Sequence, residues 1–227
     1  MTGPPRRSEP CALWAMFAIL GACVVNASPV TVQVATSSGD AAIDAIVVFD
    51  PLDSPAPGTA APGTAAPGTA ATGTAATAVI DQINKRFVPH VSVVRTGTSI
   101  TFPNSDHIRH QVYSFSSAKT FSLKLYAGSP KVDVVFDKPG LVVLGCNIHD
   151  TMVAFVGVVD SPYFAKITDT GAVTLDLPAG HYRMRIWHPN LAAVTQAPQE
   201  VTVTEKPASI PVIVQLDPGR ETVAAWP

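Results

Sequence analysis

Three residues in the second half of the chain have side chains that bind soft metal ions. Cys146, His149 and Met152 follow one another at three-residue intervals in the segment Cys-Asn-Ile-His-Asp-Thr-Met. Thiolate and thioether sulfur suit Cu(I), and imidazole nitrogen suits copper in either oxidation state. A single short loop can bring such ligands onto one ion with little loss of chain entropy. The segment therefore predicts a copper site.

A further ligand is expected from a strand that is distant in sequence. The segment from Asn104 to Val112 contains two histidines, His107 and His110, and both are candidates. A structural zinc site commonly takes four strong ligands, such as two cysteines and two histidines. One cysteine with two histidines and a methionine is a poor set for zinc, and it favours copper.

Many short strands are expected to position these residues. Residues 30–35 alternate between apolar and polar, and residues 43–49 form a β-branched run. Further strands are expected at 78–82, 91–95, 99–102, 111–115, 120–126, 132–136, 141–145 and 153–159, with Gly, Pro and Asn turn signals between them. This pattern indicates an all-β sandwich or barrel. Four aromatic side chains are expected in its core: Phe115, Phe121, Tyr126 and Phe155.

Residues 1–27 are typical of a secretory signal peptide. Arg6 and Arg7 form its charged start, an apolar stretch follows, and Ala27 ends a small-residue cleavage site. As an alternative, the Leu-Gly-Ala-Cys segment that ends at Cys23 looks like a bacterial lipobox. We therefore expect a periplasmic or otherwise exported protein, which is attached to a membrane only if Cys23 is lipidated.

Cysteine usage agrees with a metal site. The chain has three cysteines, and signal cleavage removes Cys11 and, at the ordinary site, Cys23. Exported proteins commonly pair their cysteines as disulfides, so the remaining Cys146 is a buried hydrophobe, a reactive thiol or a metal ligand. The formal net charge of −2 gives no basic footprint for nucleic acid.

The chain changes character twice along its length. Residues 54–77 repeat Pro-Gly-Thr-Ala-Ala without charged, aromatic or long aliphatic side chains, which predicts a flexible low-complexity linker. Later, Thr168-Asp169-x-Gly171 precedes the segment Leu-Pro-Ala-Gly-His-Tyr that ends at Tyr182. This pattern is similar to the carboxypeptidase-regulatory-like, transthyretin-like β-sandwich modules. We expect residues 28–53 and 161–220 to form one such small sandwich, with residues 78–160 inserted as a second domain and 221–227 as a tail.

The inserted segment resembles another family. Pro103-Asn104-x-Asp106, a following His-x-Val and the later Cys-x₂-His-x₂-Met resemble the cupredoxins, especially plastocyanin and amicyanin. The wider run is similar to bacterial plastocyanin-like proteins that are often labelled methylamine-utilisation proteins. The resemblance implies a Greek-key cupredoxin sandwich over residues 78–160.

The same resemblance implies a ligand set for one copper ion. It favours His110 over His107, because a His-x-Val that enters a strand is the family pattern. Many cupredoxins have Asn directly after this histidine, where it helps to brace the cysteine loop; this chain has Gln111. The equatorial ligands would be His110, Cys146 and His149, and the axial ligand Met152.

A blue copper protein of this kind is expected to carry single electrons and not to be an enzyme. Its partners would be periplasmic redox proteins, such as a c-type cytochrome or a dehydrogenase, which would dock briefly on an apolar collar formed by Ile148, Pro103 and Val153. Two alternatives stay open: a copper-delivery protein without a redox partner, and a cell-surface binding module in which copper is incidental.

The other histidines are expected to be structural. His90 and His181 are predicted as surface residues beside strands. His188, in Trp-His-Pro, is predicted as a packed edge residue, with a second metal site as the alternative.

Overall fold

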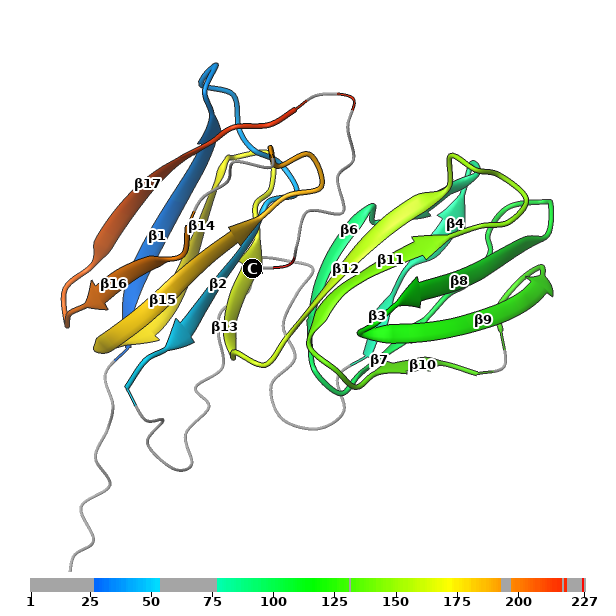
Figure 1. Ribbon diagram of the computed structural model, residues 1–227, viewed down its shortest axis with the longest axis horizontal. Helices are drawn as coiled ribbons and strands as arrows, with labels where there is room; N and C mark the ends of the chain where they lie inside the picture. Colours follow the sequence, from blue (N-terminus) through cyan, green and yellow to red (C-terminus); the bar gives the residue numbers. More distant parts are fainter. Residues whose placement is uncertain are drawn as a thin grey trace, which may run out of the picture.

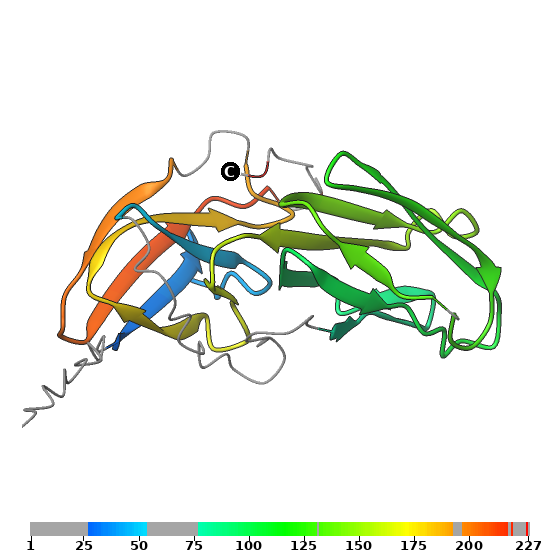
Figure 2. The same ribbon diagram turned by 90° about the horizontal axis from the view of Figure 1, so that it is seen from below.

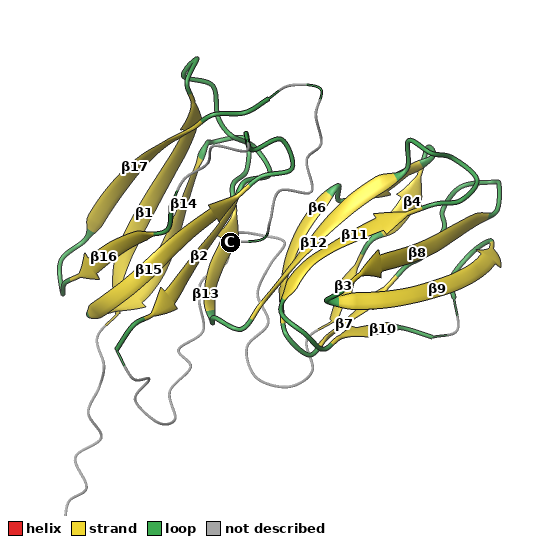
Figure 3. Cartoon of the chain, in the orientation of Figure 1, coloured by secondary structure: helices red, strands yellow, loops and turns green. Residues whose placement is uncertain are grey.

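The computed structural model describes residues 27–53, 77–130, 132–192, 197–217, 219 and 226. In this part of the chain every regular element is a β-strand (Figure 3), so the prediction of an all-β sandwich protein is confirmed. No helix within these ranges is long and apolar enough to span a membrane. The predicted signal segment with Cys23, the predicted linker up to residue 76 and most of the predicted tail lie outside the described residues.

Two β-sandwiches lie side by side (Figures 1 and 2). We call the one that carries the predicted metal ligands the middle sandwich. Its larger sheet has the order β6-β12-β11-β8-β9. These strands are β6 (Val91–Arg95), β12 (Val153–Val159), β11 (Gly140–Gly145), β8 (His110–Ser116) and β9 (Lys119–Tyr126). The facing sheet has the order β10-β7-β3, and β4 pairs with β5 as a hairpin. These strands are β10 (Val134–Phe136), β7 (Thr98–Thr101), β3 (Thr77–Val79), β4 (Asp81–Ile83) and β5 (Arg86–Val88).

Strands from both ends of the chain build the other sandwich, which we call the terminal sandwich. One sheet has the order β14-β1-β17, and the other has the order β13-β2-β15-β16. The strands are β1 (Ala27–Thr36), β2 (Ile46–Pro51), β13 (Tyr163–Lys166), β14 (Ala172–Pro178), β15 (Gly180–Trp187), β16 (Gln199–Val203) and β17 (Ala208–Val214). Strands before and after the middle sandwich thus share both sheets; the exact domain limits stay a prediction.

The two sandwiches meet through strands that are buried on both faces. In β2, Val47 and Phe49 belong to the core of the terminal sandwich, whereas Ile46 and Val48 belong to a separate cluster between the sandwiches. Alternation along a strand sends successive side chains to opposite faces, so a continuous apolar run is expected where both faces are covered. The partners across the boundary come from β6 and β12: Val91, Val93, Phe155 and Val159.

Aromatic rings close this boundary. Trp187, at the end of β15, is 1% exposed, and its ring centroid lies 5.5 Å from that of Phe155 and 5.8 Å from that of Trp226. A Cβ at Gly157 would overlap the ring of Trp226. Glycine at this position therefore leaves the space that the indole occupies.

One core prediction is wrong. Phe115 is 80% exposed, although it was expected in the core with Phe121, Tyr126 and Phe155. In β8 the inward positions are His110, Val112 and Ser114, so Phe115 falls on the outer face by the period of two. Its ring packs there against Tyr113, with the ring centroids 5.1 Å apart.

The aromatic cluster predicts a large stability effect at the boundary. We expect Trp187→Ala to lower the free energy of unfolding by about 3 kcal/mol. This is the lower end for a buried tryptophan, because its Nε1 has no hydrogen-bond partner within the described ranges. Urea unfolding followed by circular dichroism measures this change. Val132→Ala is the control, since that side chain is 67% exposed, and it should change the value by less than about 0.5 kcal/mol. Equal effects of the two variants would contradict the packing described above.

Candidate metal centre

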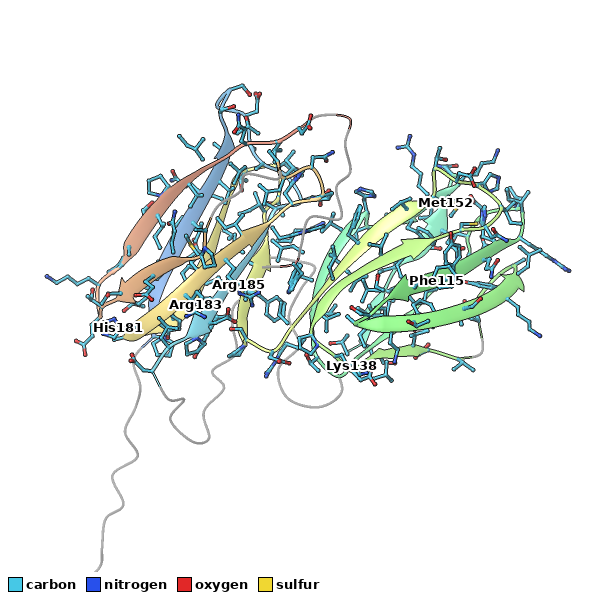
Figure 4. All side chains as sticks on the ribbon, in the orientation of Figure 1. Phe115, Lys138, Met152, His181, Arg183 and Arg185 are labelled. Carbon is cyan, nitrogen blue, oxygen red and sulfur yellow. The ribbon has the colours of Figure 1, made fainter. Side chains whose placement is uncertain are left out.

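Strand directions bring the four predicted ligands to one end of the middle sandwich. His110 is the first residue of β8, Cys146 follows the last residue of β11, and Met152 precedes the first residue of β12. Because β11 runs antiparallel to both β8 and β12, the start of β8, the end of β11 and the start of β12 share one edge. His149 lies in the loop that joins β11 to β12. Figure 4 marks Met152 at this end of β12, away from the terminal sandwich.

Three of the four side chains form a tight cluster. One ligand atom each from His110, Cys146 and His149 lies within 4.8 Å of the others. The Sγ of Cys146 is 3.9 Å from Nδ1 of His110, and the two imidazole centroids are 5.1 Å apart. His110 is 0% exposed and Cys146 is 3% exposed. Among the described residues, no fourth His, Cys, Asp or Glu joins this cluster.

The cluster has the dimensions and the open valences of a metal site. Two donors held on one ion at about 2.0 to 2.3 Å and splayed by about 110 to 120° lie roughly 3.6 to 3.8 Å apart, close to the separation of Cys146 and His110. The Nδ1 of His149 is buried and has no hydrogen-bond partner among the described residues. Buried polar atoms are nearly always paired, so this nitrogen requires a partner, and a metal ion would supply one.

Met152 supplies a further sulfur at the same end. Its side chain is 1% exposed and belongs to the same buried cluster of residues as Cys146. The amide N–H of Met152 donates to the carbonyl oxygen of His149 at 2.9 Å, which tightens the loop between the two residues. The loop thus returns to the core directly after His149.

An aspartate that the sequence analysis quoted in a motif, but to which it gave no role, holds the ring of His110. The Oδ2 atom of Asp106 lies 2.7 Å from Nε2 of His110, and the Asp106 side chain is 13% exposed. A carboxylate accepts hydrogen bonds, so Nε2 carries the proton and donates it. In the neutral ring, Nδ1 is then unprotonated, and its lone pair is available on the side of Cys146.

Backbone amides hold Asp106 in its ionised form. Burial raises the pKa of this carboxyl, but hydrogen bonds from the amides of Lys85 and Asn84 and from the ring of His110 outweigh that effect, and its pKa lies below the usual value. The amide of Asn84 is 2.6 Å from Oδ1, and the amide of Lys85 is 2.8 Å from Oδ2.

A buried polar network supports the segment that leads into β8. Asn104 donates from Nδ2 to the carbonyl oxygens of Ile108 and Tyr126, both at 2.9 Å, and accepts the amide N–H of Asp106 at 3.0 Å. Gln82, which is 0% exposed, donates from Nε2 to the carbonyl of Pro103 and to the hydroxyl of Tyr126. Asn104 therefore braces the loop that carries His110.

Gln111 does not take the bracing role that asparagine has in many cupredoxins. Its Nε2 donates to Oγ of Ser122 on β9 at 3.0 Å, at an exposed position. The pairing of β8 with β9 is irregular here: His110 faces Tyr126 and Val112 faces Leu123, so two steps of β8 correspond to three of β9. A β-bulge of this kind changes the direction of the neighbouring side chains, and such bulges are common beside functional sites.

The remaining histidines lie outside the cluster. His107 is exposed in the turn before β8, and His181 is exposed on β15, as expected. His90 is half-buried and donates from Nδ1 to the carbonyl of Val153.

His188 is buried; its Nε2 donates to the carbonyl of Ile43, and its Nδ1 accepts the amide of Asn190. Burial lowers the pKa of His188. With both nitrogens paired, His188 lies in the structure as the packed residue that was predicted, and it belongs to no metal-binding cluster among the described residues.

Aliphatic side chains are exposed around the loops of this end. Ile148, directly before His149, is 52% exposed, and Ile108, in the turn before His110, is 42% exposed. Two members of the predicted apolar collar, Pro103 and Val153, are half-buried. The loops that carry the two histidines thus present apolar surface to solvent.

Comparisons with known proteins give structural likeness only. No protein-family model and no curated protein matches the chain. A copper-containing nitrite reductase from Thermus scotoductus is similar over 42% of this chain and 24% of its own, with 23% identity and a TM-score of 0.34. A purple cupredoxin from Nitrosopumilus maritimus covers 37% of this chain and 99% of its own, at 22% identity and a TM-score of 0.32.

An oxidised variant of amicyanin is similar over 36% of this chain and 80% of its own, at 17% identity and a TM-score of 0.33. These scores are too low to support an inference of function. The chain also spans less than a quarter of the nitrite reductase, 24% of its length.

The network beneath the site predicts the ionisation of Tyr126. Burial of the phenol raises its pKa from 10.0 to about 12, and the hydrogen bond from Gln82 lowers it only in part. The stability that the neutral phenol contributes is therefore complete below pH 10 and is lost as the pH rises towards about 12. Absorbance after a rapid pH jump on the folded protein should show that Tyr126→Phe removes a component that titrates near pH 12.

Tyr182 supplies the internal reference for this measurement, because burial raises its pKa to about 12 as well. The component near pH 12 should therefore become smaller in Tyr126→Phe but persist through Tyr182. A lost component that titrates near pH 10 would show that Tyr126 is not packed in the network.

Proposed function

We propose that the protein binds one copper ion at His110, Cys146, His149 and Met152 and carries single electrons as a cupredoxin-like protein. The observation that carries this proposal is the buried cluster of one thiol and two imidazoles, in which Nδ1 of His149 has no hydrogen-bond partner in the part of the chain that the structure describes. A site of one cysteine, two histidines and a weak methionine is the ligand set of electron-transfer copper. When bound there, copper would supply a Cu(II)/Cu(I) couple.

The chain supplies rigidity to this site. His110 is held by Asp106 and begins a strand, Cys146 and Met152 are buried at strand ends, and the loop between them is closed by a backbone hydrogen bond. Ligands that are fixed by packing and by hydrogen bonds move little when the charge of the site changes, and this favours fast electron transfer.

The surface at this end supports transient docking of redox partners. The ring of His149 is half-buried beside the exposed Ile148, so an electron can leave or arrive through this ring when a partner covers the apolar surface. Weak electron-transfer encounters use small interfaces. We propose periplasmic redox proteins as partners, a c-type cytochrome or a dehydrogenase, in keeping with the signal segment that the sequence predicts.

The first test is the colour of the copper complex. Addition of Cu(II) to the purified mature protein should produce one intense visible thiolate-to-copper absorption band per chain, and Cys146→Ser should abolish it. His107→Ala is the matched control, because His107 lies in the same loop as His110 but is exposed, and it should keep the band. Retention of the band and of copper affinity in Cys146→Ser would end the proposal.

The second test separates electron transfer from copper delivery. Cyclic voltammetry of the copper-loaded protein should give a reversible one-electron wave, and the protein should exchange electrons rapidly with cytochrome c. Met152→Leu should keep the absorption band and raise the reduction potential, because the weak thioether donor to Cu(II) is lost. A copper-loaded protein with the band but without reversible electron exchange would favour the delivery role instead.

A further inference from the structure

We infer that Asp106 is a positioning residue for the metal site: it fixes the ring of His110 with an unprotonated Nδ1 directed at Cys146, and it is itself fixed by the β4–β5 turn. This inference rests on the proposed function for its effect on copper. It makes a separate claim about the metal-free protein, because the hydrogen bond to Asp106 uses Nε2 of His110, whereas the other ring nitrogen, Nδ1, faces Cys146.

The first step of the argument is the number of donors that meet the carboxylate. Asp106 accepts three hydrogen bonds from the described residues: two from backbone amides and one from Nε2 of His110. Backbone amides cannot lose their protons to the carboxylate, and the arrangement fills one oxygen with two donors and the other with one. A carboxylate is therefore the group that fits this position; a side-chain amide would place its own N–H₂ against at least one N–H donor.

The second step is the backbone conformation that orients those two amides. Asn84 and Lys85 form the two-residue turn between β4 and β5, and their φ angles are +53° and +58°. Two successive residues with positive φ define the type I′ turn of tight hairpins. Both amides of this turn donate to Asp106, so the β4–β5 hairpin holds the Asp106 carboxylate in place.

The third step is the consequence for the ligand atom. A metal-bound histidine is oriented by a hydrogen bond from its second ring nitrogen, and an anionic acceptor raises the donor strength of the first. Loss of such a partner typically lowers metal affinity about 10- to 100-fold. Asp106 therefore sets both the orientation of the His110 ring and the affinity of its Nδ1 for copper.

The test compares the parent with Asp106→Asn and Asp106→Ala, first without metal. Nitrogen-15 NMR of the histidine rings should show His110 of the metal-free parent as the Nε2–H tautomer, with a slowly exchanging ring proton. Both variants should lose that slow exchange and should shift the ring towards a mixture of tautomers. The backbone amide signals of each variant, compared with those of the parent, report whether the variant keeps its fold.

The second arm of the test uses copper. Competition with a chromophoric Cu(I) chelator should show about 10- to 100-fold weaker binding by Asp106→Asn, and voltammetry should show a higher reduction potential, since a negative charge beside the ligand is lost. Asp150→Asn is the control: Asp150 is exposed next to His149, so it removes the same charge near the site and should leave the tautomer of His110 and the Cu(I) affinity unchanged.

The outcomes separate the two proposals. An unchanged tautomer, affinity and potential in Asp106→Asn, with a parent that binds copper, would overturn the role of Asp106 and leave the proposed function standing. A parent that fails to bind copper would overturn the proposed function, and the tautomer measurement would still decide whether Asp106 positions His110. An equal loss of affinity in Asp150→Asn would also overturn the inference, because the effect would then come from net charge.

Discussion

The structure depends on one constraint: a thiol and two imidazoles are buried together, and their donor atoms need partners. A buried polar atom without a hydrogen bond costs about 1 to 3 kcal/mol, and Nδ1 of His149 is such an atom as far as the described residues show its surroundings. Apolar residues at these positions would pack without that cost. The surrounding residues form a frame that holds the donor atoms together. The ends of strands fix the positions of Cys146 and Met152, and Asp106 fixes the ring of His110. Asn104 fixes the loop that leads to His110.

The frame extends beyond the ligands into both sandwiches. Strand β12 begins beside Met152, runs through the core of the middle sandwich and reaches the boundary with the terminal sandwich through Phe155 and Val159. Val153, the first residue of β12, also accepts a hydrogen bond from His90 at its carbonyl oxygen. Motion of the ligand loop is therefore coupled to a strand that is packed on both faces, and packed interiors resist small displacements.

Much of this arrangement could be predicted from the sequence, and the predictions that failed did so for physical reasons. The alternation in β1 and the apolar run in β2 predicted strands. Residue type and spacing predicted Cys146 and His149 as neighbours, whereas His110 was preferred over His107 only through the resemblance to cupredoxins. Phe115 was misplaced because an aromatic residue in a strand was assigned to the core without counting from His110, whose inward position puts Phe115 outside. The β4–β5 hairpin was missed because its turn has Asn84-Lys85 in place of the usual Asn-Gly, so positive φ at Lys85 carries no glycine signal. The role of Asp106 depends on that hairpin, and a contact between residues 85 and 106 cannot be read from either segment alone.

The central claim is that the sulfur of Cys146 and the ring nitrogens of His110 and His149 bind the same ion. X-ray absorption at the copper edge of the loaded protein tests this most directly, since it reports the atoms around the metal whatever the colour or the potential of the complex. The account predicts one short sulfur contact and two imidazole nitrogen contacts per copper ion. A spectrum with nitrogen and oxygen neighbours but no sulfur would contradict it.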